Sequence, residues 1–138
     1  MRVVLDTNVV VSALIWGGKP MVLLEAAAEG NVRLFTSAAL LAELREVLAR
    51  PHLAAKLERQ SSSVDRALTH YTGLANSVTP DATPRVVPTD ADDDHVIAAA
   101  VTARADLIVT GDSDLLTIGT HRGIAILTPA AALTRLGT

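Results

Sequence analysis

Arg2-Val3-Val4-Leu5-Asp6-Thr7-Asn8-Val9-Val10-Val11 is the stretch that decides the fold. Its first residues are β-branched and aliphatic, which is typical of a strand buried on both faces of a parallel sheet. The strand ends at Asp6, and open α/β sheets bind their ligands at the carboxyl ends of such strands. Asp6 could instead serve only as the cap of the next helix, a role open to Thr7 and Asn8 as well. The stretch predicts a central strand that ends in a candidate functional acid.

Length and composition favour one compact domain over residues 1–138. Apolar residues make up 49% of the chain, which contains no cysteine and has a net charge of −3. No apolar run reaches the ~18 residues that a membrane helix needs, and Asp6 interrupts the N-terminal apolar stretch too early for a signal peptide. Without cysteine, thiolate metal sites and disulfide frameworks are excluded. We expect a cytoplasmic protein with no membrane partner.

Further strand and helix patterns alternate along the chain. Strands are predicted at residues 32–36, 106–110 and 123–128, with a short one at 85–87. Helices are predicted at residues 9–15, 21–29, 37–50 and 94–101, and after Pro129, while residues 52–78 suit a helical arm. Alternation of this kind predicts a three-layer α/β/α sandwich on a mostly parallel sheet.

Three later segments carry acidic residues that would reach the same end of the sheet as Asp6. Glu43 lies at the rim of the apolar stripe of helix 37–50, although it could be an ordinary solvated carboxylate. Four acids occur in the five positions 90–94, more than helix-dipole capping requires. Of these, Asp94 shares a helix face with Ile97, Ala98 and Val101, whereas residues 92 and 93 are expected to diverge from it. Asp94 is therefore the predicted inward acid.

The third segment is Gly111-Asp112-Ser113-Asp114, which follows the strand at residues 106–110. Glycine permits a tight turn there, and two acids stand just beyond the end of the strand. Asp112 or Ser113 could instead act as the cap of a following helix. Convergence of Asp6, Glu43, Asp94, Asp112 and Asp114 would create one acidic site.

Such a site favours hard cations with oxygen ligands, Mg²⁺ or Mn²⁺, because no histidine has convincing ligand spacing. These ions activate water and stabilise both oxygens of an in-line phosphoryl displacement. Two divalent cations would change the formal net charge from −3 to +1, so a polyanionic substrate is compatible with the composition. Metal-dependent hydrolysis of phosphodiesters is the reaction that fits best.

Four motifs, in order, resemble the PIN-domain nucleases. They are Leu5-Asp6-Thr7-Asn8, Glu43 within residues 41–51, Asp94 before Val96-Ile97-Ala98-Ala99-Ala100, and Val109-Thr110-Gly111-Asp112-Ser113-Asp114-Leu115. The sequence is most similar to the short stand-alone branch that contains the toxins of toxin–antitoxin pairs. This resemblance covers nearly the whole chain.

The resemblance implies a five-stranded sheet of order 3-2-1-4-5 and Mg²⁺- or Mn²⁺-dependent endoribonuclease activity. It also implies a homodimer that a cognate antitoxin protein silences. Asp6, Glu43, Asp94 and Asp112 would be the catalytic, metal-binding quartet, with Asp114 as an accessory ligand. The resemblance further implies that four polar side chains orient ligands, water or substrate: Thr7, Asn8, Thr110 and Ser113.

The sequence departs from this branch at Ala91, where proline is common, and at His95, where lysine is common. The second departure leaves open whether His95 contacts a phosphate or is a plain surface residue. Neither departure touches the expected quartet.

Three other functions remain open at this point. A phosphatase of the haloacid-dehalogenase type would use Asp6 as nucleophile but needs a second Asp at position 8, which is Asn. A receiver-like module would bind Mg²⁺ in the acidic pocket but needs a late lysine, and none follows Lys56. A catalytically idle member of the nuclease family could act as an RNA- or partner-binding scaffold.

Overall fold

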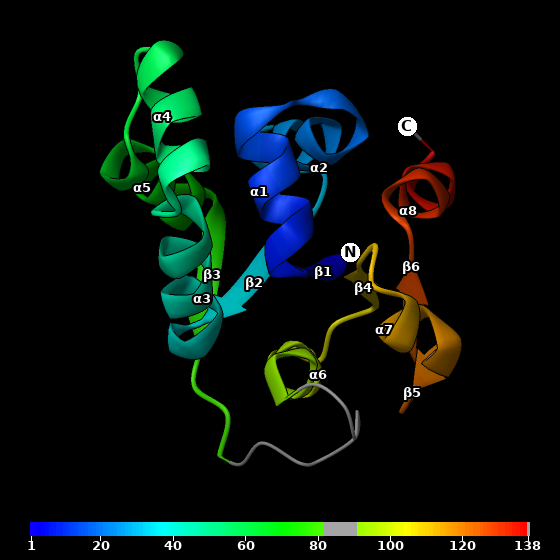
Figure 1. The fold of residues 1–138 in the computed structure, drawn as a ribbon. Coiled ribbons are helices and arrows are strands. Elements are labelled where there is room, and N and C mark those ends of the chain that lie inside the picture. Colours follow the sequence, from blue (N-terminus) through cyan, green and yellow to red (C-terminus); the bar gives the residue numbers. More distant parts are fainter. Residues whose placement is uncertain (82–90, 138) are drawn as a thin grey trace.

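The computed structural model describes residues 1–81 and 91–137, and for residues 91 and 92 the backbone alone. Strands and helices alternate over most of this chain (Figure 1). The strands are β1 (Arg2–Leu5), β2 (Arg33–Ser37), β3 (Ala75–Val78), β4 (Leu107–Val109), β5 (Thr120–His121) and β6 (Ile124–Leu127). The helices are α1 (Thr7–Ile15), α2 (Gly18–Ala28), α3 (Ala38–Leu48), α4 (Pro51–Arg59), α5 (Val64–Leu74), α6 (Ala91–Ala103), α7 (Ser113–Ile118) and α8 (Pro129–Leu136).

The strands form one sheet of order β3-β2-β1-β4-β6-β5. All neighbouring pairs are parallel except β5 and β6. The α/β fold class with a mostly parallel sheet is confirmed, whereas the six strands among the described residues differ slightly in number and order from the predicted five-stranded 3-2-1-4-5. The sixth strand, β5, was not predicted, because two residues are too few to show a period.

The core consists of two clusters, one on each face of the sheet. Side chains of neighbouring residues in a strand point to opposite faces, and β1 follows this rule: Val3 and Leu5 belong to one cluster, Val4 to the other. Helices α1, α2, α5 and α8 contribute to the first cluster, and α6 and α7 to the second. In Figure 1, α1 and α6 accordingly lie on opposite sides of β1. This is the predicted three-layer arrangement.

Local sequence explains where the helices begin. The hydroxyl of Ser37 accepts the N–H of Leu40 at 3.3 Å and caps α3. Pro51 occupies the first turn of α4, where no N–H is needed. Gly17, which precedes α2, and Gly18, its first residue, both have positive φ, a backbone conformation that favours glycine. These signals divide the chain into short helices.

The predicted helical arm at residues 52–78 is wrong at its end. Helices α4 and α5 account for most of this range, but Ala75–Val78 is strand β3, which pairs with β2 at the edge of the sheet. Apolar residues at helical spacing continue through Leu74 and Ala75, so periodicity alone did not mark the change. The strand predicted at residues 85–87 lies outside the described residues.

Within the described ranges, no single helix has both the length and the apolar character to cross a membrane. Helices α1 and α2 meet the criterion only when taken together, and they are bent by 94° relative to each other.

Tyr71 is the only tyrosine of the chain, so the effect of tyrosine ionisation on stability at alkaline pH can be measured at a single residue. Burial on α5 raises the pKa of its phenol well above the ordinary value of 10.0, because the phenolate would lose its hydration. The unfolded chain therefore releases this proton first, so the contribution to stability is complete below about pH 10 and is lost above it. Above that pH we expect the free energy of unfolding to fall more steeply in the parent than in Tyr71→Phe, by up to about 1.4 kcal/mol per pH unit.

Urea unfolding of both proteins at increasing pH measures this difference. Phenolate absorbance gives a second readout and should appear only as the protein unfolds. A phenolate signal near pH 10 in protein that is still folded would contradict the raised pKa.

Candidate active site

Parallel pairing of β1 with β4 determines the position of Asp6. Leu5 is the register partner of Val109, and the N–H of Asp6 donates to the carbonyl of Val109 at 2.9 Å. This bond extends the pairing one residue beyond β1 and holds Asp6 beside the end of β4. The side chain of Asp6 is buried, with 5% exposed. The first predicted acid therefore lies at the carboxyl edge of the sheet.

Thr110 joins the ends of the two strands through its hydroxyl group. Thr110 Oγ1 donates to Asp6 Oδ2 at 2.7 Å and accepts the N–H of Asp112 at 2.9 Å. Thr110 is fully buried, so both hydrogen bonds are shielded from water. One hydroxyl thus orients the Asp6 carboxylate and the backbone of Asp112 together.

The alternative that these acids serve only as helix caps has different outcomes for Asp6 and Asp112. Asp6 occupies the N-cap position of α1, but its side chain makes no capping hydrogen bond. Asp112 caps α7, because its Oδ2 accepts the N–H of Leu115 at 3.0 Å. A carboxylate has more than one lone pair to offer. The capping bond therefore fixes the orientation of Asp112 and leaves its carboxylate able to bind a cation or accept another hydrogen bond.

Asp93, Asp112 and Asp114 form the acidic group of the described residues. Each offers a carboxylate oxygen, and these three oxygens all lie within 4.8 Å of one another. Asp93 is buried, Asp112 half-buried and Asp114 exposed, so the group extends from the interior to the surface. The structure thus unites two predicted residues, Asp112 and Asp114, with one that was not predicted.

Asp93 was expected to diverge from the inward face of α6, but it is buried and lies close to Asp112 and Asp114. Helix α6 is buried almost all round between residues 93 and 100, so its apolar pattern does not select one inward face. The members that join the second core cluster include Val96, Ile97 and Ala100. These lie three, four and seven residues after Asp93, at the spacing of one helix face. Asp94 has apolar residues at the same spacing, so the sequence did not distinguish the two acids.

Asp94 and Glu43, two members of the predicted quartet, lie outside this acidic group of the described residues. Asp94 follows on the first turn of α6 and is fully buried. Glu43 is half-buried on α3, a helix that contacts α6 and α1. Helix α3 thus contacts both α6 and the helix that follows Asp6, while the acidic group itself forms between α6 and the start of α7.

The other predicted polar residues differ in exposure. Thr7 is buried, and its Oγ1 has no hydrogen-bond partner in the described part of the chain. Asn8 is exposed and lines a cavity of about 150 Å³ with Ser12 and Gly111. Ser113 is exposed at the first position of α7. Of the orienting residues predicted from sequence, Thr110 has the contacts with the acids described above.

The ligand types in this group fit a hard divalent cation. Three carboxylates offer oxygen ligands only, which Mg²⁺ and Mn²⁺ prefer. Three negative charges at such short range repel one another unless a cation or proton is shared. The buried, unbonded hydroxyl of Thr7 beside Asp6 is a further oxygen at this edge. The residues present therefore fit a metal.

Residues 2–114 match the model of a family described as PIN domain. The chain belongs to the PIN domain family. Nuclease function is typical of PIN domains, which assigns this one to the hydrolases that act on nucleic acid. The phosphatase and receiver alternatives are thereby set aside. An uncharacterized protein of Methanocaldococcus jannaschii is 31% identical to this PIN domain over 119 residues, 86% of this chain and 75% of the relative.

Two solved structures have a similar fold. The crystal structure of VapBC2 from Rickettsia felis, bound to a DNA fragment from their promoter, contains a chain with a TM-score of 0.62 and 18% identity. That match covers 91% of this PIN domain and 97% of the other chain. The crystal structure of FitAcB from Neisseria gonorrhoeae contains a chain with a TM-score of 0.57 and 19% identity. That match covers 93% of this PIN domain and 98% of the other chain.

Replacing Thr110 with valine tests the bridge between the strand ends. Thr110→Val keeps the side-chain shape but removes the donor to Asp6 and the acceptor for the Asp112 N–H. We expect the free energy of unfolding to fall by about 1–3 kcal/mol, since buried polar groups lose their partner. Thr110→Ser should retain most of the parental free energy of unfolding. Urea unfolding measures the stability of both variants.

The matched control is Thr117→Val. Thr117 is exposed and its hydroxyl donates within α7, to the carbonyl of Ser113 at 2.7 Å. We expect a change within about 0.5 kcal/mol there. Equal losses in the two valine variants would show that the Thr110 bridge contributes nothing particular to stability.

Proposed function

We propose that this PIN domain is a metal-dependent endoribonuclease. The observation that carries the proposal is the acidic group of Asp93, Asp112 and Asp114, beside the buried Asp6, at the carboxyl edge of a PIN-domain sheet. Such an edge is where α/β folds place their ligands. Hydrolysis of a phosphodiester is the chemistry that a nuclease fold with these carboxylates supports.

Asp93, Asp112 and Asp114 are the residues that would hold Mg²⁺ or Mn²⁺. When bound, such an ion would supply an activated water and stabilise charge on the oxygens of the phosphodiester. The capping bond from Leu115 keeps Asp112 in a fixed orientation. Thr110 holds Asp6 through a 2.7 Å hydrogen bond, so that this carboxylate need not reorient when substrate binds.

Within the catalytic set we propose Asp6, Glu43, Asp112 and a carboxylate from the first turn of α6, with Asp114 as an accessory ligand. We assign the α6 position to Asp93 on the basis of its distance to Asp112 and Asp114. Asp94, the residue favoured by sequence, is the competing assignment. Thr7, Asn8, Thr110 and Ser113 are proposed as the residues that orient ligands, water or substrate.

We further propose that the substrate is RNA and that the protein is the toxin of a toxin–antitoxin pair. Support comes from the four motifs described above and from the similar fold of chains in VapBC2 and FitAcB, each covered almost completely. A cognate antitoxin protein, a homodimer and a cytoplasmic location belong to the same proposal.

An RNA-cleavage assay with Asp6→Asn tests the activity. Single-stranded RNA is incubated with purified protein and Mn²⁺ or Mg²⁺, with single-stranded DNA of the same sequence in parallel. We expect the parent to cut RNA only with metal, and Asp6→Asn to lower the rate by about 100-fold or more. Even residues that merely orient metal ligands typically contribute roughly 10- to 100-fold.

The control for charge is Asp65→Asn, which removes an exposed carboxylate paired with Arg45 at 3.1 Å. An exposed pair of this kind contributes little to stability, so this variant should cut at the parental rate. Cleavage by Asp6→Asn at the parental rate would place the active site elsewhere or reveal a contaminating nuclease. A parent that binds RNA but never cuts it would favour the idle scaffold.

Thermal unfolding with Mn²⁺ distinguishes Asp93 from Asp94. A ligand that binds only folded protein at 100 times its Kd stabilises it by about 2.7 kcal/mol. We expect Mn²⁺ to raise the Tm of the parent and of Asp94→Asn but not that of Asp93→Asn, with NaCl of equal ionic strength as the control. If Mn²⁺ instead raised the Tm of Asp93→Asn but not that of Asp94→Asn, the result would favour Asp94, the residue predicted from sequence.

A further inference from the structure

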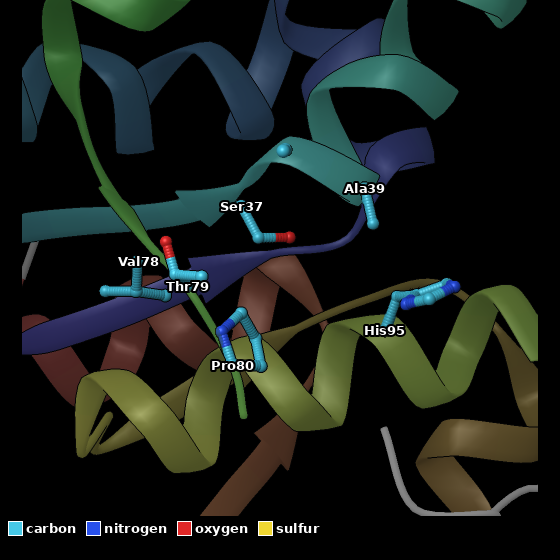
Figure 2. A pocket seen from close by; sticks show the side chains of 7 residues that line it. Ser37, Ala39, Val78, Thr79, Pro80 and His95 are labelled. Atoms are coloured by element: carbon cyan, nitrogen blue, oxygen red, sulfur yellow. The ribbon is translucent and has the colours of Figure 1, made fainter. Parts of the chain in front are cut away.

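A cavity of about 200 Å³ opens at the carboxyl ends of β2 and β3, apart from the acidic group. Its described lining comes from three elements: residues 37–39 where β2 passes into α3, residues 78–80 at the end of β3, and His95 on α6. Figure 2 shows Ser37, Val78 and Thr79 at the strand ends, with His95 on α6 on the other side. None of these residues belongs to the proposed catalytic set.

The cavity lies at the same end of the sheet as Asp6, one strand away from it. Strand β2 is the direct neighbour of β1, whose end carries Asp6, so Ser37 lies about one strand spacing, roughly 5 Å, from that strand. His95 follows Asp93 by two residues, which places it about 200° around the helix, on the opposite flank. The first turn of α6 thus faces the acids with one flank and the cavity with the other.

The lining chemistry matches a flat, polar-edged ring better than a phosphate. Ala38, Ala39, Val78 and Pro80 give apolar walls, while Ser37, Thr79 and His95 give hydroxyl and imidazole groups. No Arg or Lys occurs among the described lining residues, which leaves a phosphate without a permanent counter-charge. The Ser37 hydroxyl already accepts the Leu40 N–H but can still donate.

The volume supports the same conclusion. Water occupies about 30 Å³ per molecule in the liquid, so 200 Å³ is far more than a structural water needs. Pockets for drug-sized ligands begin at about 300 Å³. A single heterocyclic ring with its substituents is the size of group that this cavity suits.

We propose that this cavity binds the base of an RNA nucleotide next to the phosphodiester that meets the acidic group, and so sets the base preference of cleavage. This inference rests on the proposed ribonuclease function. Sequence-specific proteins commonly read single-stranded RNA by splaying out an unstacked base and hydrogen-bonding to its edges. Here Thr79 and His95 bond to the base edge, and the apolar residues contact its faces.

The scarcity of aromatic residues agrees with an enclosed base rather than a stacking platform. The chain has one Phe, one Tyr and one Trp. Phe35 and Tyr71 are buried in the core, and the exposed Trp16 lies at the end of α1 opposite to Asp6. Discrimination between bases therefore depends on the shape and polar groups of the cavity.

Filling the cavity is the experiment. Ala39 is an exposed lining residue on the first turn of α3, where leucine is tolerated as a good helix former. The matched control is Ala55→Leu, at an alanine within α4 that is also exposed but is not among the residues that line the cavity. Both are compared with the parent on single-stranded RNA libraries carrying each of the four bases, or an abasic site, near the cleaved bond.

We expect the parent to prefer one or two bases at a single position. Ala39→Leu should lower kcat/KM for the preferred base by about tenfold, with no change for the abasic substrate. Ala55→Leu should behave as the parent. Thr79→Val, a nearly isosteric change at an exposed residue, is the second probe and should weaken the preference without slowing the abasic substrate.

Two outcomes would overturn the inference while leaving the ribonuclease intact. In one, the parent and Ala39→Leu share the same base profile. In the other, Ala39→Leu slows all four bases and the abasic substrate equally, which indicates a backbone phosphate in the cavity. A parent that cuts no RNA with metal present would instead overturn the proposed function itself.

Discussion

Parallel pairing of β1 with β4 is the constraint on which the acidic edge depends. The register that matches Leu5 with Val109 places Asp6 beside Thr110, and the two strands then diverge into α1 and the turn before α7. A slip by one residue would turn every side chain of β1 to the other face of the sheet. Val3, Val4 and Leu5 are all buried in the core, so such a slip is costly. Core packing thereby determines which side chains meet at the edge.

The strands that carry the acids were the most predictable part of the chain. Buried parallel strands are continuous apolar runs, and residues 2–5 and 107–109 are easily recognised as such. The end of α5 was harder, because Ala75–Val78 has no alternation strong enough to separate strand from helix. Asp93 was missed for a related reason: α6 is buried almost all round, and a helix with no polar face does not show in its sequence which acid turns inward.

Capping and site formation, treated as alternatives in the sequence, are compatible in the structure. Asp112 both caps α7 and lies within the acidic group, and the cap gives that carboxylate a fixed orientation. Asp6 stands at a cap position without capping, and its carboxylate is oriented by Thr110 instead. Local helix chemistry therefore orients one acid and a bond between strands orients the other. The first was predicted as a helix cap, and Thr110 was among the orienting residues that the family resemblance implied.

No connecting loop separates β1 from α1, because Asp6 alone stands between Leu5 and Thr7. An inserted residue at this junction would rotate the acid relative to the strand or shift the whole helix, since neither neighbour has slack to absorb it. The turn between α4 and α5 has no such restriction, as residues 60–63 lie between the two helices and are exposed or half-buried. Over evolutionary time, changes of length should accumulate in the arm, while the junction at Asp6 keeps its length.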